Sequence, residues 1–195
     1  MAMNVQKAEF LLSAASAEQF PKTRLPEIAF LGKSNVGKSS AINCLLRRKQ
    51  IAKVGGKPGK TVHVNYFLVD GCYFVDLPGY GYAQVPQSEK ERWAKLMEQY
   101  FAAGRVDFAV LLVDARHAPT QNDITMVNWL KDAGCPYSVA ANKIDRCKKS
   151  EIPGNLRTIR EDLALPDSCA LIPFSAEKGT GRDELMRSIL AAIAS

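Results

Sequence analysis

One short stretch limits the possible folds of this chain more than any other. "GKSNVGKSS" occupies positions 32–40, directly after the apolar run "EIAFL". It fits the pattern GxxxxGK followed by Ser or Thr, with Gly32, Gly37, Lys38 and Ser39 in the defining positions. Glycines let successive backbone N–H groups curl around an anion, and the N-terminus of a following helix adds unpaired N–H groups. A strand, this turn and a helix in that order predict a phosphate-binding loop, in which Lys38 reaches the outer phosphates and Ser39 joins a Mg²⁺ shell.

Apolar runs of strand length alternate with helical patterns from residue 27 to the end of the sequence. The runs are apolar at consecutive positions, as expected of strands buried on both faces. This alternation predicts an α/β fold: a doubly wound, mostly parallel sheet with helices on both faces. The expected strands cover residues 8–14, 27–32, 65–70, 72–77, 108–115, 137–142 and 169–176. The dipeptide Asp70-Gly71 predicts a hairpin between two of them, and therefore one antiparallel strand.

Five helices are expected between and after these strands. The first follows the phosphate turn, from Ser39 to about Arg48, and the second begins at Ser88 with a capping-box pattern, "SEKE". The third begins near Thr120 or Gln121, the fourth covers about 150–164, and the fifth begins at about Arg182.

The length and composition predict one domain over residues 1–195, with a short N-terminal strand extension at about 5–20. Hydrophobic residues make up 47% of the 195 residues, enough for a core. The longest apolar runs fall well short of the about 20 residues that a membrane helix needs. The five cysteines show no CxxC spacing, which favours reduced thiols. We therefore expect a cytoplasmic protein with no membrane segment and no signal peptide.

A second motif, "NKID", follows the expected strand at 137–142 and indicates which base is bound. The Asp145 carboxylate can accept hydrogen bonds from N1–H and the 2-amino group of guanine, whereas adenine would leave it unpaired. Asn142 can contact the other side of the base or tie the site together, and the Lys143 stem can cover the face of the base. At the next strand end, in Ser175-Ala176-Glu177, the Ala176 N–H can meet the guanine carbonyl oxygen.

A third motif, "DLPG" at 76–79, supplies residues for the metal and the γ-phosphate. Asp76 would hold Mg²⁺ through water, and the Gly79 N–H would meet the γ-phosphate. The lysine-rich loop at 49–63 contains Thr61, the best hydroxyl to complete the Mg²⁺ shell when GTP is bound. The alternative is that the lysines of this loop serve only as a basic surface.

Together these motifs, in this order, resemble the translation-factor-like P-loop GTPases. "GKSNVGKSS", "KPGKT", "NYF", "VDLPGYGYA" and "DARH" narrow the resemblance to the EngB family of bacterial ribosome-biogenesis GTPases, from about residue 8 to the end. The resemblance implies a Ras-like fold, GTP hydrolysis to GDP, and roles in assembly of the large ribosomal subunit and in cell division and septation. It also implies a K⁺ ion near Asn35, beside the leaving phosphate. The alternative for Asn35 is a turn residue that tolerates unusual backbone angles.

Tyr80 stands where Ras-like proteins carry the glutamine that orients the attacking water, so we expect slow intrinsic hydrolysis. A nucleotide-gated binding module with negligible hydrolysis is the alternative that Tyr80 supports. A P-loop kinase or ATPase is a third possibility, against which the guanine motif argues.

Charge is unevenly distributed and suggests a polyanionic partner. The net charge is +6, with +8 in residues 1–60 and −2 in the rest. We expect a monomer that binds a large-subunit precursor through rRNA, ribosomal proteins or both. Two basic clusters would bind this partner. The first is Arg47, Arg48, Lys49, Lys53, Lys57 and Lys60, and the second is Arg146, Lys148 and Lys149.

The candidate site residues fall into three overlapping sets. The predicted nucleotide-binding residues are Gly32, Lys33, Ser34, Asn35, Val36, Gly37, Lys38, Ser39, Ser40, Gly59, Lys60, Thr61, Asp76, Leu77, Pro78, Gly79, Asn142, Lys143, Asp145, Ser175, Ala176 and Glu177. The predicted catalytic residues are Lys38, Asn35, Thr61 and Gly79, and the predicted Mg²⁺ ligands are Ser39, Thr61 and Asp76.

Overall fold

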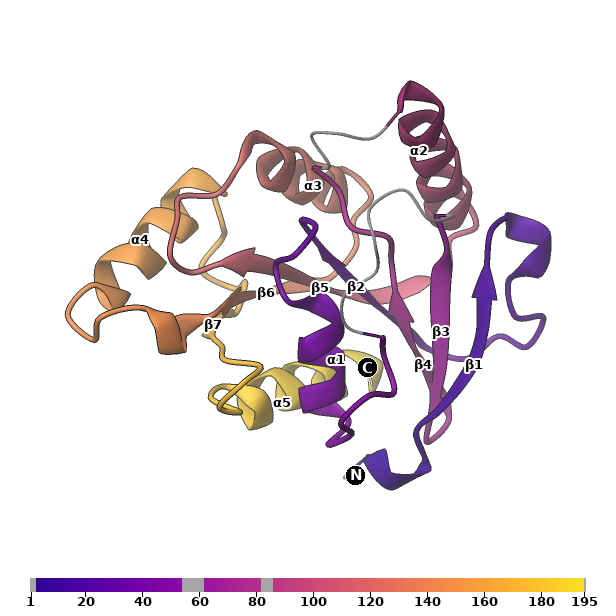
Figure 1. Cartoon of the computed structure of the whole chain (residues 1–195), viewed down its shortest axis with the longest axis horizontal. Coiled ribbons are helices and arrows are strands. Elements are labelled where there is room, and N and C mark those ends of the chain that lie inside the picture. The colour runs from indigo at the N-terminus through magenta and orange to yellow at the C-terminus, as the bar shows by residue number, and fades with distance from the viewer. Residues whose placement is uncertain (1–2, 54–61, 82–85, 195) are drawn as a thin grey trace.

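The computed structural model describes residues 3–53, 62–81 and 86–194, and within them a seven-stranded sheet lies between two layers of helices (Figure 1). Across the sheet the strands run in the order β1 (Glu9–Ala14), β3 (Val64–Val69), β4 (Cys72–Asp76), β2 (Glu27–Gly32), β5 (Val106–Asp114), β6 (Tyr137–Asn142) and β7 (Leu171–Pro173). β3 is antiparallel to both of its neighbours, and all other pairs are parallel. The predicted fold class, with its one antiparallel strand, is confirmed.

The helices divide between the two faces of the sheet. α2 (Gln87–Ala102), α3 (Gln121–Asp132) and α4 (Ile152–Asp162) pack on one face, and α1 (Lys38–Leu45) and α5 (Arg182–Ile193) pack on the other (Figure 1). β5 shows why its sequence is continuously apolar. Leu111 and Val113 pack in the core between the sheet and α2, α3 and α4. Val110 and Leu112 pack in the core on the opposite face, between the sheet and α1 and α5.

The N-terminal extension forms the edge of this sheet. The 3₁₀ turn η1 (Val5–Lys7) precedes β1, and the turn η2 (Ala17–Gln19) follows it. Among the described residues β1 pairs with β3 alone, so residues 9–14 add one strand at the edge of the sheet. A third 3₁₀ turn, η3 (Ile144–Arg146), follows β6. Over the described ranges, every helix is too short or too polar to span a lipid bilayer.

Several predicted boundaries are wrong, and the backbone explains why. α1 ends at Leu45 instead of Arg48, because Arg47 takes the left-handed conformation with φ 51°. α2 begins at Gln87, after Pro86 in the capping position, and the predicted cap at Ser88 is not formed. The strand predicted over 169–176 is shorter, at Leu171–Pro173.

Among the described helices, a capping box forms instead at α3. There Thr120 and Asp123 exchange side-chain and backbone hydrogen bonds. α4 begins at Ile152, later than the expected start near residue 150, with Pro153 in its first turn, where a missing N–H costs little.

The hairpin prediction is confirmed in detail. Val69 pairs with Cys72, so the turn consists of Asp70 and Gly71 alone, with φ of 44° and 86°. Two positive φ values in a two-residue turn match the right-handed twist of the flanking strands. The hairpin sets the direction of β4, which ends at Asp76, beside the phosphate-binding loop.

Candidate nucleotide-binding site

The predicted motifs meet at one edge of the sheet. β2, β4, β5, β6 and β7 are parallel, so their carboxyl ends lie on the same side. The phosphate loop follows β2, "DLPG" follows β4, "NKID" follows β6 and "SAE" follows β7. In open α/β sheets this edge is where ligands bind.

The phosphate loop needs glycine at two positions for steric reasons. A Cβ at Gly32 would lie 2.7 Å from Val36 Cγ1 and 2.9 Å from the Leu112 carbonyl oxygen. A Cβ at Gly37, where φ is 97°, would lie 2.5 Å from Asn142 Nδ2. Gly32 lies against Leu112 of β5 and Gly37 lies against Asn142 of β6, so a larger residue at either position would have to displace the loop from the sheet.

Two of the three predicted magnesium-binding residues, Ser39 at the start of α1 and Asp76 at the end of β4, lie next to each other. Ser39 Oγ donates a hydrogen bond to Asp76 Oδ2 at 3.2 Å, and Lys38 Nζ forms an ion pair with Asp76 Oδ1. A hydroxyl and a carboxylate side by side are hard oxygen donors of the kind that Mg²⁺ prefers, so these residues fit the ion. Gly59, Lys60 and Thr61 lie outside the described residues.

Asn142 joins the phosphate loop to the two base-binding motifs. Its Nδ2 donates to the Val36 carbonyl at 2.9 Å, and its Oδ1 accepts from the Ala176 N–H at 3.2 Å. The side chain is buried. Asn142 therefore holds three segments together, which was one of its two predicted uses. The Ala176 N–H, expected to meet the guanine carbonyl, here donates to Asn142.

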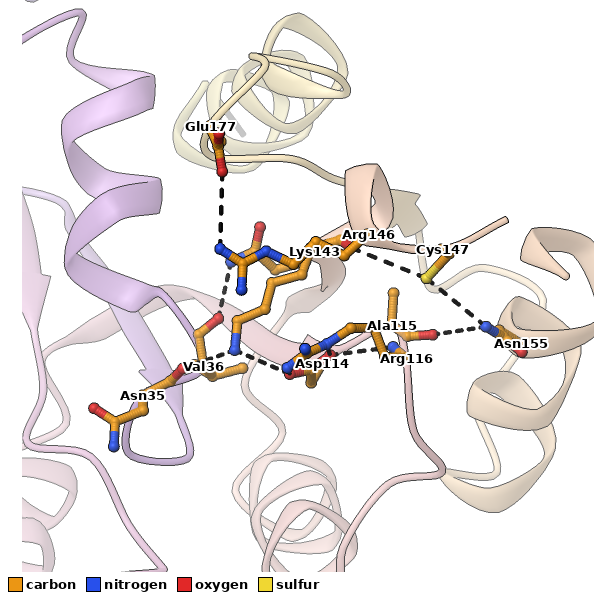
Figure 2. A network of polar contacts seen from close by, with 11 residues as sticks. Asn35, Val36, Asp114, Ala115, Arg116, Lys143, Arg146, Cys147, Asn155 and Glu177 are labelled. Carbon is orange, nitrogen blue, oxygen red and sulfur yellow. Dashed lines mark hydrogen bonds and ion pairs between the residues drawn. The ribbon is translucent and has the colours of Figure 1, made fainter. Parts of the chain in front are cut away.

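Lys143 makes a second connection to the phosphate loop (Figure 2). Its Nζ donates to the Asn35 carbonyl at 2.9 Å and to Asp114 Oδ2 at 3.0 Å. Asp114 also accepts from Arg116, at 2.9 Å from Nε and 2.7 Å from Nη2. Burial alone would raise the pKa of Asp114, but the hydrogen bonds from Arg116 and Lys143 hold that pKa well below its usual value.

Sequence reasoning did not assign this role to Asp114. The residue belongs to the string "DARH", which carried the family resemblance but no function. The available signal was its position, since Asp114 is the last residue of a buried parallel strand that ends at the site edge.

The side chain expected to select guanine is held in place by the last motif. Ser175 Oγ donates to Asp145 Oδ1 at 2.5 Å and accepts from the Lys178 N–H at 3.0 Å. Asp145 lies on the wall of a cavity of about 410 Å³, a size typical of small-molecule sites. The cavity is lined by Gly37, Ser40, Asn43, Cys44, Arg48, Lys49, Asn142, Lys143, Asp145, Arg146, Ala176 and Glu177.

The "DLPG" segment lies directly against the phosphate loop. A Cβ at Gly79 would lie 3.1 Å from both the Cα and the N of Ser34, so a larger residue would push the two segments apart. The Ser34 N–H donates to the Tyr80 carbonyl at 2.8 Å. The Gly79 amide is therefore placed beside the turn that is expected to hold the phosphates.

Asn35 has the backbone expected of a tolerant turn residue, with φ 63°. Its side chain is exposed and points away from Lys143 (Figure 2). The backbone of Asn35 thus serves Lys143, while the side-chain amide faces solvent.

The chain is similar to known GTP-binding proteins. The family model described as 50S ribosome-binding GTPase matches residues 27–143. A probable GTP-binding protein EngB from Geobacillus kaustophilus is 45% identical over 99% of this chain and 100% of its own length. One from Clostridium acetobutylicum is 47% identical over 98% of this chain and 96% of its own.

Solved structures show the same fold. The crystal structure of a probable GTP-binding protein EngB has a TM-score of 0.73 at 26% identity, covering 86% of this chain and 98% of that chain. Era, in complex with MgGDPNP and nucleotides 1506–1542 of 16S ribosomal RNA, has a TM-score of 0.65 at 25% identity, covering 87% of this chain and 57% of that chain.

Proposed function

This chain belongs to the EngB family of GTP-binding proteins and is a GTPase, and from this premise we propose that it is a slow molecular switch in assembly of the large ribosomal subunit. It acts as a monomer in the cytoplasm. The GTP-bound form binds the precursor particle, and hydrolysis to GDP releases it.

The observation that carries the guanine part of this proposal is the cavity between the phosphate loop and "NKID". Asp145 lies on its wall with one carboxylate oxygen bound by Ser175. A carboxylate fixed in this way accepts from the two donors of guanine, and it would be left unpaired by adenine. Asn142 and Lys143 keep this wall at a fixed distance from the phosphate loop through Val36 and Asn35.

Hydrolysis rests on positioning and electrostatics. Lys38 neutralises charge on the outer phosphates, and the Gly79 N–H donates to the γ-phosphate. Ser39 and Asp76, with Thr61 from the loop outside the described residues, would hold Mg²⁺, which would supply positive charge against the charge that develops on the phosphates. The Asn35 side chain would hold a K⁺ ion, which would supply positive charge beside the leaving phosphate.

The slow rate follows from Tyr80. Its ring is buried and its hydroxyl donates to Asp123, on α3, at 2.7 Å. A side chain held in the core does not orient a water at the γ-phosphate. The same feature supports the alternative function, a nucleotide-gated module with negligible hydrolysis. A turnover assay with GTP and with ATP separates the two, because the module turns over neither nucleotide.

A basic rim on the cavity supports an RNA partner. Arg48 and Lys49 follow α1, and Arg146 follows "NKID", yet all three line the same cavity. Arg48 is held by the Gln6 carbonyl at 2.8 Å. The buried Asn43 exchanges two 2.8 Å hydrogen bonds with the backbone of Ala52, which fixes the turn that carries the first two cations. Cations on one fixed rim suit the phosphates of an RNA strand.

Co-sedimentation with large-subunit particles tests the proposal. The protein loaded with a non-hydrolysable GTP analogue should bind the particles more tightly than the GDP form. Binding should also weaken steeply between about 50 and 200 mM salt, since cations on RNA release counterions. Reversal of two exposed residues, Arg47→Glu with Lys53→Glu, should weaken binding and flatten the salt dependence without changing GTP affinity.

The matched control is Lys90→Glu with Lys95→Glu on α2, which makes the same change in net charge on another exposed surface. It should leave particle binding near the parent value. Equal binding of the GTP and GDP forms would contradict the switch. Equal effects of the two double variants would contradict RNA binding by the basic cluster after α1, to which Arg47 and Lys53 belong together with the rim residues Arg48 and Lys49.

A further inference from the structure

We propose that Tyr80 and Asp123 are positioning residues for GTP hydrolysis: their hydrogen bond holds the Gly79 amide against the phosphate loop. The inference rests on the proposed role of Gly79 toward the γ-phosphate. It adds a residue of α3, far from the nucleotide motifs in sequence, to the machinery that distinguishes GTP from GDP.

The bond between the two side chains is fully buried. Tyr80 Oη donates to Asp123 Oδ1 at 2.7 Å, and the two residues are 6% and 4% exposed. Asp123 Oδ2 accepts from the backbone N–H and the hydroxyl of Thr120, each at 2.7 Å. A buried carboxylate is costly unless donors surround it, and here the Tyr80 hydroxyl is one of three. Burial and the nearby Asp123 both raise the pKa of Tyr80, so the phenol remains a donor.

The backbone on both sides of Gly79 is also held. Before it, the Pro78 carbonyl accepts from Trp93 Nε1, on α2, at 3.0 Å. After it, the Tyr80 carbonyl accepts from the Ser34 N–H at 2.8 Å, and the Tyr80 N–H donates to the Gly32 carbonyl at 3.4 Å. Tyr80 is therefore bound on one side to the phosphate loop and on the other to α3.

The consequence is specific to one nucleotide state. Gly79 packs closely on Ser34, where a Cβ would lie 3.1 Å from the backbone. The next residue, Tyr80, binds Ser34 and Gly32 through its own backbone, so the position of the Gly79 amide depends on Tyr80. GDP lacks the γ-phosphate that this amide would meet. Removal of the Tyr80 hydrogen bond to Asp123 should therefore lower the affinity for GTP and leave the affinity for GDP unchanged.

Tyr80→Phe is the test, because it keeps the ring and removes only the hydroxyl. The affinity for a non-hydrolysable GTP analogue should fall roughly tenfold or more relative to the affinity for GDP, as expected for loss of one hydrogen bond to a charged group. The kcat should fall as well, with GDP affinity unchanged. In an Asp123→Asn background the same substitution should have a smaller effect, because the partner is already altered.

Tyr100→Phe is the matched control. Tyr100 is also a buried tyrosine whose hydroxyl donates to a carboxylate, that of Glu27 at 3.0 Å, at the opposite end of β2 from the phosphate loop. This variant should lose stability but keep the parent ratio of GTP-analogue to GDP affinity.

The outcomes are distinguishable. If the parent hydrolyses GTP but Tyr80→Phe leaves the ratio of GTP-analogue affinity to GDP affinity unchanged, the positioning role is wrong and the proposed function stands. An equal loss of affinity for both nucleotides is one such result. A parent protein that does not hydrolyse GTP would contradict the proposed function itself. A selective loss for the GTP analogue in Tyr80→Phe, absent in Tyr100→Phe, supports the proposal.

Discussion

At the scale of single residues, the site depends on side chains whose orientation is fixed by a neighbour. Ser175 orients Asp145, Asp114 orients Lys143, and Asp123 orients Tyr80. In each pair one partner comes from a different strand end or helix. Such pairs fix polar groups before a ligand arrives, which lowers the cost of binding.

Asp145→Asn tests base selection. The amide places a donor where guanine also presents donors, so GTP affinity should fall roughly tenfold or more. Xanthosine nucleotides, which carry a carbonyl at that position, should bind better to the variant than to the parent. Fluorescence titration with both nucleotides measures the exchange of preference. Ser175→Ala keeps the carboxylate but removes the orienting hydrogen bond, along with the acceptor for the Lys178 N–H. It should give a smaller loss of GTP affinity with no gain for xanthosine nucleotides. Unchanged GTP affinity in Asp145→Asn would contradict the assignment.

Asn35 supports a prediction about the monovalent ion. Its backbone already serves Lys143, so the exposed amide is available to an ion beside the phosphates. Hydrolysis should be faster in KCl than in NaCl at equal ionic strength, and Asn35→Ala should abolish the difference. Rates of phosphate release in the two salts decide the question. Identical rates for the parent would show that Asn35 is only a turn residue.

At the scale of elements, the phosphate loop is attached to the ends of two neighbouring strands. β6 contributes Asn142, bound to Val36, and β5 contributes Asp114, bound through Lys143 to Asn35. Because β5 and β6 are paired in parallel along their length, these two attachments move together. The loop is thus positioned by the sheet as well as by its own glycines.

Asp114→Asn tests this attachment through the pH dependence of the free energy of unfolding. The folded pKa of Asp114 lies below the unfolded value of about 3.8, so its charge stabilises the fold above that pH. The stability is lost as the pH falls through the folded pKa. The variant should be less stable than the parent by roughly 1–3 kcal/mol near neutral pH, and the difference should shrink below about pH 4. Urea unfolding at a series of pH values measures it. A difference that is constant with pH would contradict the role of this charge.

At the scale of the whole molecule, one sheet serves two cores. Residues of β5 alternate between the cores, and β1 joins the same sheet through β3. Loss of either core would expose one face of every central strand. We therefore expect the two cores and the N-terminal strand to unfold together.

Thermal unfolding tests this expectation. Far-ultraviolet and near-ultraviolet circular dichroism should report coincident transitions. Mg²⁺ with GDP at about 100 times its Kd should add roughly 2.7 kcal/mol of stability, because the ligand binds only the folded state. ADP at the same concentration should leave the transition unchanged. Separate transitions would contradict a single cooperative domain, and equal stabilisation by ADP would contradict guanine selection.

The sequence by itself determined the features that depend on local backbone chemistry. Gly32 and Gly37 mark the phosphate turn because a Cβ does not fit there, and Asp70-Gly71 marks the hairpin because both residues need positive φ. The motifs at the ends of apolar runs could be placed at one edge, because parallel strands end on the same side of a sheet. The family resemblance added the identity of the fold.

Only the tertiary structure decided which of these polar groups bind one another. The Asn142 bond to Val36 and the Lys143 bond to Asn35 join residues 106 and 108 positions apart, and the Tyr80 bond to Asp123 joins residues 43 apart. The capping box at Thr120 instead of Ser88 has a local reason, because Pro86 already stands in the capping position of α2. Local patterns report the backbone preference of a few neighbouring residues. A hydrogen bond between distant segments depends on the packing of the whole sheet, which no short stretch of sequence contains.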